Sequence, residues 1–123
     1  MRQILMSINP QHVEDIVSGN KKYEYRKQLC KRVPDRIIIY STYPIMKIIG
    51  EVEVLGILHD TPSTIWKKTS MFSGIDKKFF DLYYSGRKLA VAYKLGKVKV
   101  YNKPKELADF GCSYAPQSYV YIN

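Results

Sequence analysis

The stretch that decides the fold is Gly19-Asn20-Lys21-Lys22-Tyr23-Glu24-Tyr25-Arg26, where charged and aromatic side chains alternate after a glycine. Alternation with a period of two is typical of a β-strand, because successive side chains point to opposite faces of a sheet. Lys22, Glu24 and Arg26 would share one face. Gly19 is placed to end a preceding helix, since glycine tolerates left-handed backbone. The stretch therefore predicts a helix-to-strand junction that presents charged side chains.

Upstream of this junction, the residues predict a strand followed by a short helix. Residues 3–8 form a short apolar segment that ends at Asn9-Pro10. Asn9 can cap a helix, and Pro10 fits the first helical position, where no backbone N–H is needed. Apolar residues then recur at helical spacing, so we expect the helix to cover residues 10–18.

Downstream, strands dominate and helices are inserted between them. A helix should begin at Thr61-Pro62, and Ser73 with Asp76 resembles a capping box for another helix that ends at Gly86. Gly96 is read as a bend between two strands. The expected strands are 36–42, 48–58, 88–95, 97–101 and 119–122. This order favours one α+β domain over residues 1–123, a small mixed β-barrel rather than a doubly wound parallel sheet.

The net charge limits the kind of partner. Twenty Lys and Arg against eleven Asp and Glu give +9, and the excess is concentrated in residues 21–36 and 87–105. Concentrated positive charge attracts a polyanion through counterion release and long-range steering. A basic surface that serves only solubility stays open as the alternative.

The sequence predicts no metal, no cofactor and no membrane span. Cys30, Cys112, His12 and His59 are scattered without the paired spacing of a zinc site, so both cysteines are expected to be free thiols. No apolar run approaches the roughly 20 residues that cross a bilayer. Since no signal-peptide pattern follows the first apolar segment, we expect a cytoplasmic protein.

Several motifs carry a resemblance to a known family. Residues 19–26 resemble the GxKxxExR motif of ASCH domains, in the PUA-like superfamily. Thr42-Tyr43-Pro44, Gly50-Glu51-Val52 and Ala115-Pro116-Gln117-Ser118-Tyr119 are similar to later segments of that family. The resemblance implies a PUA-like α+β fold, a five- or six-stranded β-barrel flanked by about three helices, with a cleft lined by the first motif.

The resemblance also implies a set of activities: nucleic-acid binding, ribonuclease action and hydrolysis of N-acetylated cytidine. The acetylcytidine hydrolases have a threonine where this chain has Glu24, and they use a downstream glutamate that is absent between Thr61 and Asp76. We therefore predict an RNA- or nucleotide-binding domain. The alternative is a small hydrolase of RNA or a modified nucleoside with Lys21 and Glu24 as catalytic residues, and an adaptor for protein or DNA stays open.

Lys21, Glu24 and Arg26 form the sharpest candidate site, because a carboxylate held by two cations leaves donors for a phosphate. The alternative is an ion pair that only stabilises the barrel. Tyr43 is the best candidate for an exposed stacking ring, and Phe79, Phe80, Tyr83 and Tyr84 are read as core. The predicted ligand-binding residues are Lys21, Lys22, Glu24, Arg26, Thr42, Tyr43, Lys94, Lys97, Lys99, Gln117 and Ser118. Oligomeric state is left open.

Overall fold

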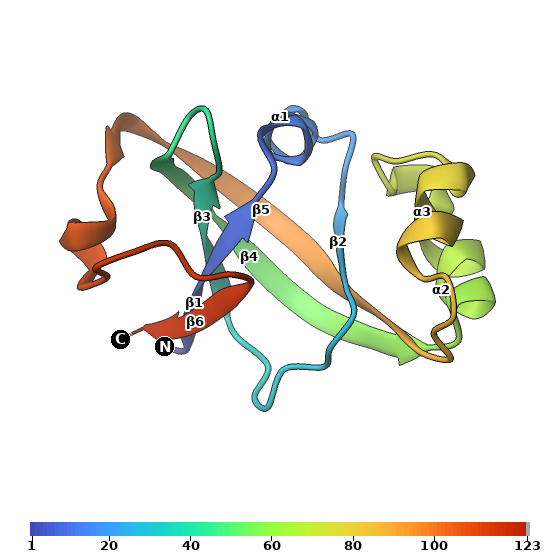
Figure 1. The fold of residues 1–123 in the computed structure, drawn as a ribbon. Coiled ribbons are helices and arrows are strands. Elements are labelled where there is room, and N and C mark those ends of the chain that lie inside the picture. The colour runs from blue at the N-terminus through green and yellow to red at the C-terminus, as the bar shows by residue number, and fades with distance from the viewer. Residues whose placement is uncertain (123) are drawn as a thin grey trace.

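Six strands build one sheet that curls into a half-barrel (Figure 1). The computed structural model describes residues 1–122. The strand order is β2-β5-β4-β3-β1-β6; β1 pairs parallel with β3, and the other neighbouring pairs are antiparallel. The elements are β1 (Gln3–Ile8), α1 (Pro10–Ser18), β2 (Tyr23–Arg26), β3 (Arg36–Ser41), β4 (Lys47–Asp60), α2 (Pro62–Thr69), η1 (Ser70–Phe72), α3 (Lys77–Tyr83), β5 (Ala90–Lys105), η2 (Leu107–Phe110) and β6 (Tyr119–Ile122).

The first helix forms as predicted. The side chain of Asn9 accepts a hydrogen bond from the Gln11 amide, Pro10 opens α1, and Gly19 ends it in the left-handed region at φ 87°. Helix α3 differs from the prediction, because Asp76 alone caps it. The Ser73 hydroxyl instead bonds the backbone of Ile75, so it is not available to a capping box.

The predicted split into two strands at Gly96 is wrong, although the register of β5 with β4 does shift there, between the pairs Val52–Val98 and Val54–Leu95. Residues 90–105 form the single strand β5, which pairs with β2 on one side and β4 on the other. Glycine in a strand permits close approach of a neighbour as well as a bend. Here the Leu55 side chain of β4 lies against Gly96, where an added Cβ would come within 3.0 Å of it.

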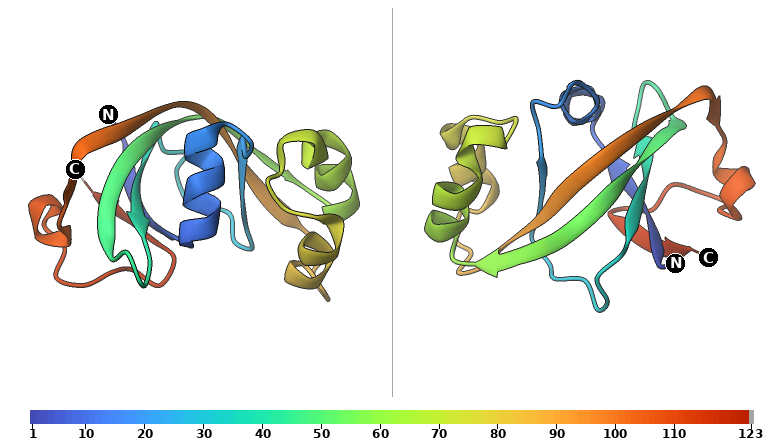
Figure 2. Two further views of the ribbon diagram at one scale, coloured as in Figure 1. Left: turned by 90° about the horizontal axis from the view of Figure 1, so that it is seen from above. Right: turned by 180° about the vertical axis from the view of Figure 1, so that it is seen from behind.

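The core lies on both faces of the central strands. Ile37, Ile38 and Ile39 of β3 are all buried, as their unbroken apolar run predicted. Helix α1 covers one face through Val13 and Ile16. Helices α2 and α3 stack at the far end of the long β4–β5 ribbon, around Phe80 (Figure 2).

The half-barrel leaves β2 and β6 at opposite edges of the sheet. Helix α1 connects β1 to β2, so these two strands descend from its two ends (Figure 1). No backbone pairing joins β2 to β1 or β6 in residues 1–122. Side chains bridge the opening instead, and the charged residues of β2 do so.

Candidate functional site

The start of β2 is fixed from two sides. The Lys21 amide donates to the Asp15 carbonyl of α1, and the Lys22 amide donates to the Phe72 carbonyl of η1. Lys21 also forms a β-bridge with Ser73. These contacts join the end of α1, the start of β2 and the segment after η1, so they set where the side chains of the motif can reach.

The predicted trio comes together as one ion-pair network. Lys21 Nζ lies 3.9 Å from one carboxylate oxygen of Glu24, and Arg26 Nη2 lies 3.0 Å from the other. Lys21 Nζ also donates to the Ser73 carbonyl at 2.8 Å. Lys21 and Glu24 are only 3% and 5% exposed. Burial therefore lowers the pKa of Lys21, a shift that the Glu24 carboxylate partly opposes.

Arg26 carries the bridge across the opening of the half-barrel. Its Nη2 donates to the Ser7 carbonyl of β1 at 2.9 Å, and its Nη1 donates to Ser118 Oγ at 3.3 Å. The Ser118 carbonyl accepts from the Ser7 amide. The buried Nε of Arg26 has no hydrogen-bond partner among residues 1–122. A guanidinium has five N–H donors, so this one keeps donors for another group.

The trio lines a hollow of about 210 Å³, which we call the site pocket. It adjoins a shallower hollow of about 440 Å³ over α1 and the start of α3, with which it shares Asn9, His12, Ile75 and Phe79. The trio is therefore buried but lies on the wall of a concavity. The full lining is Ser7, Asn9, His12, Lys21, Glu24, Tyr25, Arg26, Ile75, Phe79 and Tyr83.

His12 is a pocket residue that the sequence reading missed. Its Nδ1 is buried without a partner among the described residues. Burial is the main cause that lowers the pKa of His12. The nearby cations of Lys21 and Arg26 lower this pKa further, whereas the carboxylates of Glu24 and Asp15 oppose the shift. Its position on α1, three residues before Asp15, gave a usable signal, because this spacing puts both side chains on the helix face near the motif.

The aromatic cluster of α3 was only partly predicted. Phe80 and Tyr84 are buried core residues, as expected. Phe79 is 47% exposed and Tyr83 half-buried, and both line the site pocket. Their rings lie nearly parallel, with centroids 6.4 Å apart. Helical periodicity separates the two pairs, because positions 79 and 83 share a face that only the tertiary structure turns toward β2.

The other predicted site residues do not gather at this pocket. Lys22 and Lys94 line a different hollow. Thr42 and Tyr43 follow β3, and Tyr43 is 80% exposed, as a stacking ring requires. Only Ser118 reaches the trio; the remaining three residues, Lys97, Lys99 and Gln117, are exposed and line none of these hollows.

Other features concern the predicted absences. Cys30 and Cys112 are free thiols. Within residues 1–122, no cluster of three or more His, Cys, Asp or Glu side chains is arranged to hold a metal ion. None of the helices in this part of the chain has the length and apolar character to cross a membrane.

The pKa of His12 predicts how stability changes with pH. Because it is lowered from 6.5 in the folded state, the unfolded chain binds more protons in the window below 6.5. The contribution of His12 to the free energy of unfolding is fully present above about pH 6.5 and decreases as the pH drops through that window. We therefore expect the free energy of unfolding, measured in urea, to decrease more between about pH 7.5 and about pH 5 for the wild type than for His12→Gln. Equal losses would contradict this origin.

Comparisons with known proteins agree with the fold and the motif. The family model for the ASCH domain matches residues 6–110. The crystal structure of ASCH from Zymomonas mobilis superposes with a TM-score of 0.89 at 24% identity, covering 98% of this chain and 87% of that one. The expected PUA-like α+β fold is thereby confirmed.

Two curated relatives are longer than this chain. A protein named ATP synthase subunit alpha from Ureaplasma parvum is 30% identical over 97% of the chain, which spans 15% of that protein. An ASCH domain-containing ribonuclease from Zymomonas mobilis is 26% identical over 76% of the chain, in a match that spans 64% of the ribonuclease. Since the family model covers most of the sequence and the fold agrees with it, this chain belongs to the ASCH domain family.

Proposed function

We propose that the domain binds RNA and seats the base or the phosphate of one nucleotide in the site pocket. The observation that carries this proposal is Arg26, which lines an open hollow beside the Glu24 carboxylate and whose buried Nε–H lacks a partner among the described residues. A buried donor without a partner is costly unless something satisfies it. A phosphate or base oxygen of a bound nucleotide would do so.

The remaining groups of the pocket suit a nucleotide. The Glu24 carboxylate can accept a hydrogen bond from an exocyclic base amine or a ribose hydroxyl. The exposed ring of Phe79 offers a face for base stacking. At about 210 Å³ the hollow is smaller than typical pockets for whole small molecules, so it would take a base or a phosphate rather than a complete ligand.

The basic surface would draw the rest of the strand. Lys27 lies over the Tyr83 ring at 4.8 Å and places a cation at the pocket rim. Lys97 and Lys99 are exposed along β5 and Tyr43 is exposed after β3, so they would act outside the pocket on the backbone or on neighbouring bases. Contacts of this kind make affinity fall steeply with salt.

The test is the affinity for a labelled single-stranded RNA, measured by fluorescence anisotropy. Replacing Arg26 with Gln removes the unpaired donor and one charge. Hydrogen bonds to charged groups contribute about 1.5–3 kcal/mol, so we expect binding about tenfold weaker or more. Lys68→Gln is the matched control, because Lys68 is exposed on α2 and lines none of the hollows described here. It should stay within about twofold of wild type.

Three results would overturn the proposal: no RNA binding at low salt, a loss that is equal in both variants, or binding unchanged in Arg26→Gln. Circular dichroism should establish that Arg26→Gln is folded, since Arg26 also bridges β2 to Ser7. Phe79→Ala supplies a second probe at a half-exposed position. It should weaken binding if a base stacks on the ring, at about 1–3 kcal/mol per stacked base.

Ribonuclease action is the second candidate function. One relative carries the name ribonuclease, and burial lowers the pKa of Lys21, which increases the fraction of neutral amine that can accept a proton. The same RNA mixtures, run on denaturing gels, test it. Shortened products that disappear in a folded Lys21→Met variant would assign cleavage to this pocket. If the RNA stays at full length in every mixture, the domain binds RNA without cleaving it.

A further inference from the structure

We propose that a basic hollow at the N-terminal end of β1 binds the phosphate backbone of an RNA strand, several nucleotides away from the nucleotide held in the site pocket. This hollow, which we call the basic pocket, has a volume of about 520 Å³. It lies where the 27–35 loop between β2 and β3 passes the ends of β1 and β6 (Figure 1). Because it concerns the same RNA strand, this contact rests on the proposed function. The lining is Met1, Arg2, Lys31, Arg32, Tyr121 and Ile122.

The loop beside the basic pocket is fixed by bonds to its backbone. The Tyr121 hydroxyl accepts a hydrogen bond from the Arg32 amide at 2.9 Å and donates one to the Arg32 carbonyl at 2.8 Å. Arg2 Nη1 donates to the Val33 carbonyl at 3.0 Å. Since these bonds use backbone atoms of the loop, they hold it in place and leave the side chains of Lys31 and Arg32 available to a ligand.

The basic pocket has positive charge without an internal counterion. Arg2, Lys31 and Arg32 bring three cationic side chains to it, and none of them forms an ion pair within residues 1–122. Asp35, which is outside the lining, accepts a hydrogen bond from the Arg2 backbone amide at 2.7 Å. A guanidinium can offer two parallel N–H donors to one phosphate. The pocket therefore suits the phosphodiester groups of a nucleic acid.

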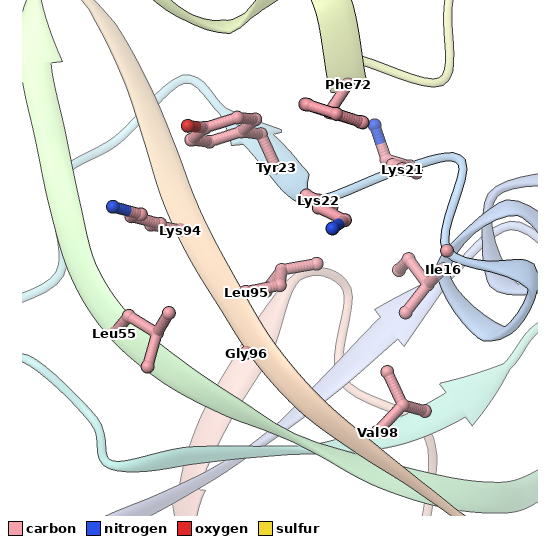
Figure 3. A pocket seen from close by; sticks show the side chains of 11 residues that line it. Ile16, Lys21, Lys22, Tyr23, Leu55, Phe72, Lys94, Leu95, Gly96 and Val98 are labelled. Carbon is pink, nitrogen blue, oxygen red and sulfur yellow. The ribbon is translucent and has the colours of Figure 1, made fainter.

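The cationic hollow beside Lys22 and Lys94 differs in how its charges are placed. Lys94 pairs across the sheet with Tyr23, the neighbour of Lys22, so the two lysines project from opposite faces of the β2–β5 pair (Figure 3). One phosphate group there does not meet both lysines. In the basic pocket the cations converge, because the fixed loop brings its two cationic side chains beside Arg2.

The length of β1 separates the basic pocket from the site pocket. Arg2 lines the basic pocket and Ser7 lines the site pocket. Five residues of extended chain cover roughly 17 Å at about 3.3 Å per residue. A single nucleotide is too short to contact both pockets. Small nucleic-acid-binding domains bind single strands of about 4–16 nucleotides, and a strand of that length can reach from one pocket to the other.

The test compares two RNA lengths in the whole chain. A dinucleotide is titrated by amide NMR, and a labelled RNA of about 12 nucleotides by fluorescence anisotropy. Lys31→Gln combined with Arg32→Gln should weaken binding of the longer RNA about tenfold and leave the dinucleotide within about twofold, because only the longer strand reaches the basic pocket. The slope of log affinity against log salt for the longer RNA should become shallower by about 1.4, since each phosphate contact of a single strand contributes about 0.7.

Lys67→Gln combined with Lys68→Gln is the matched control. These two lysines are also adjacent and exposed, they lie in the last turn of α2, and they line neither pocket. The control should keep the affinity for the longer RNA within about twofold of wild type, with an unchanged salt slope. Equal losses in the two double variants would reduce the effect to net charge and refute the basic pocket. Equal wild-type affinity for the two RNA lengths would refute it as well.

The same titrations separate the two pockets. If Arg26→Gln weakens both RNAs and the Lys31/Arg32 variant weakens neither, the site pocket stands and the basic pocket fails. If the Lys31/Arg32 variant weakens the longer RNA and Arg26→Gln changes nothing, the basic pocket stands and the site pocket fails. A wild type that binds neither RNA at low salt would refute both.

Discussion

Replacing Glu24 with Gln is expected to lower the free energy of unfolding by about 3–5 kcal/mol, the usual cost of removing one partner of a buried ion pair. Glu24 pairs with both Lys21 and Arg26 and is 5% exposed. The substitution keeps the shape and removes the charge. Lys21, only 3% exposed, would keep the Ser73 carbonyl and the Tyr25 ring as its neighbours. Urea denaturation measures the loss.

Two controls identify the mechanism. Glu14→Gln removes an exposed carboxylate of α1 and should change stability by less than about 0.5 kcal/mol. Lys21→Met combined with Glu24→Gln should recover much of the lost stability, because it removes the unpaired buried ammonium. If Glu24→Gln alone proved as stable as the wild type, the buried ion pair would contribute nothing to the free energy of unfolding.

The stability of the Glu24→Gln variant should depend on pH in a defined direction. Glu24 raises the pKa of Lys21 against the larger effect of burial, so its removal lowers that pKa further below its ordinary value of 10.5. Between the folded and unfolded pKa, the unfolded state binds more protons, and stability rises with pH. The stability deficit of Glu24→Gln should therefore shrink as the solution becomes alkaline.

Gly50→Ala should destabilise the β4–β5 ribbon by about 1–3 kcal/mol or more. The added methyl group would clash with its neighbours, and only a movement of the backbone could relieve the clash. An added Cβ would lie 2.4 Å from the Lys99 carbonyl oxygen and 3.1 Å from the Val100 Cα. Both neighbours are backbone atoms, so no rotamer change can relieve the contact. Gly50 pairs with Val100 next to a register shift in the sheet. The measurement is the urea midpoint.

Gly56→Ala is the matched control in the same strand. Nothing lies within 4 Å of an added Cβ at this position. The substitution should leave stability unchanged or raise it by about 0.4–1 kcal/mol, because alanine restricts the unfolded chain. Similar losses of stability in Gly50→Ala and Gly56→Ala would show that the backbone flexibility of glycine matters in this strand, and not the close approach of the β5 backbone at Gly50.

The elements predicted well were those set by local chemistry. The caps at Asn9 and Gly19 fix α1, and the apolar run at 37–39 fixes β3. Two of the errors, the split of a strand at Gly96 and the helix cap at Ser73, have one physical cause. A glycine can bend a strand or admit a neighbour, and a serine can cap a helix or bond its own loop, and the local sequence permits both choices.

By itself, the sequence determined the α+β class, the ASCH motif and the trio of Lys21, Glu24 and Arg26, because strand periodicity and side-chain charge are local properties. Only the tertiary structure decided what surrounds the trio. Curling of the sheet brings β2 to β1, and packing of α1 and α3 against that opening adds His12 and Phe79 to the pocket. These contacts join residues far apart in the chain, and their geometry follows from how the core packs.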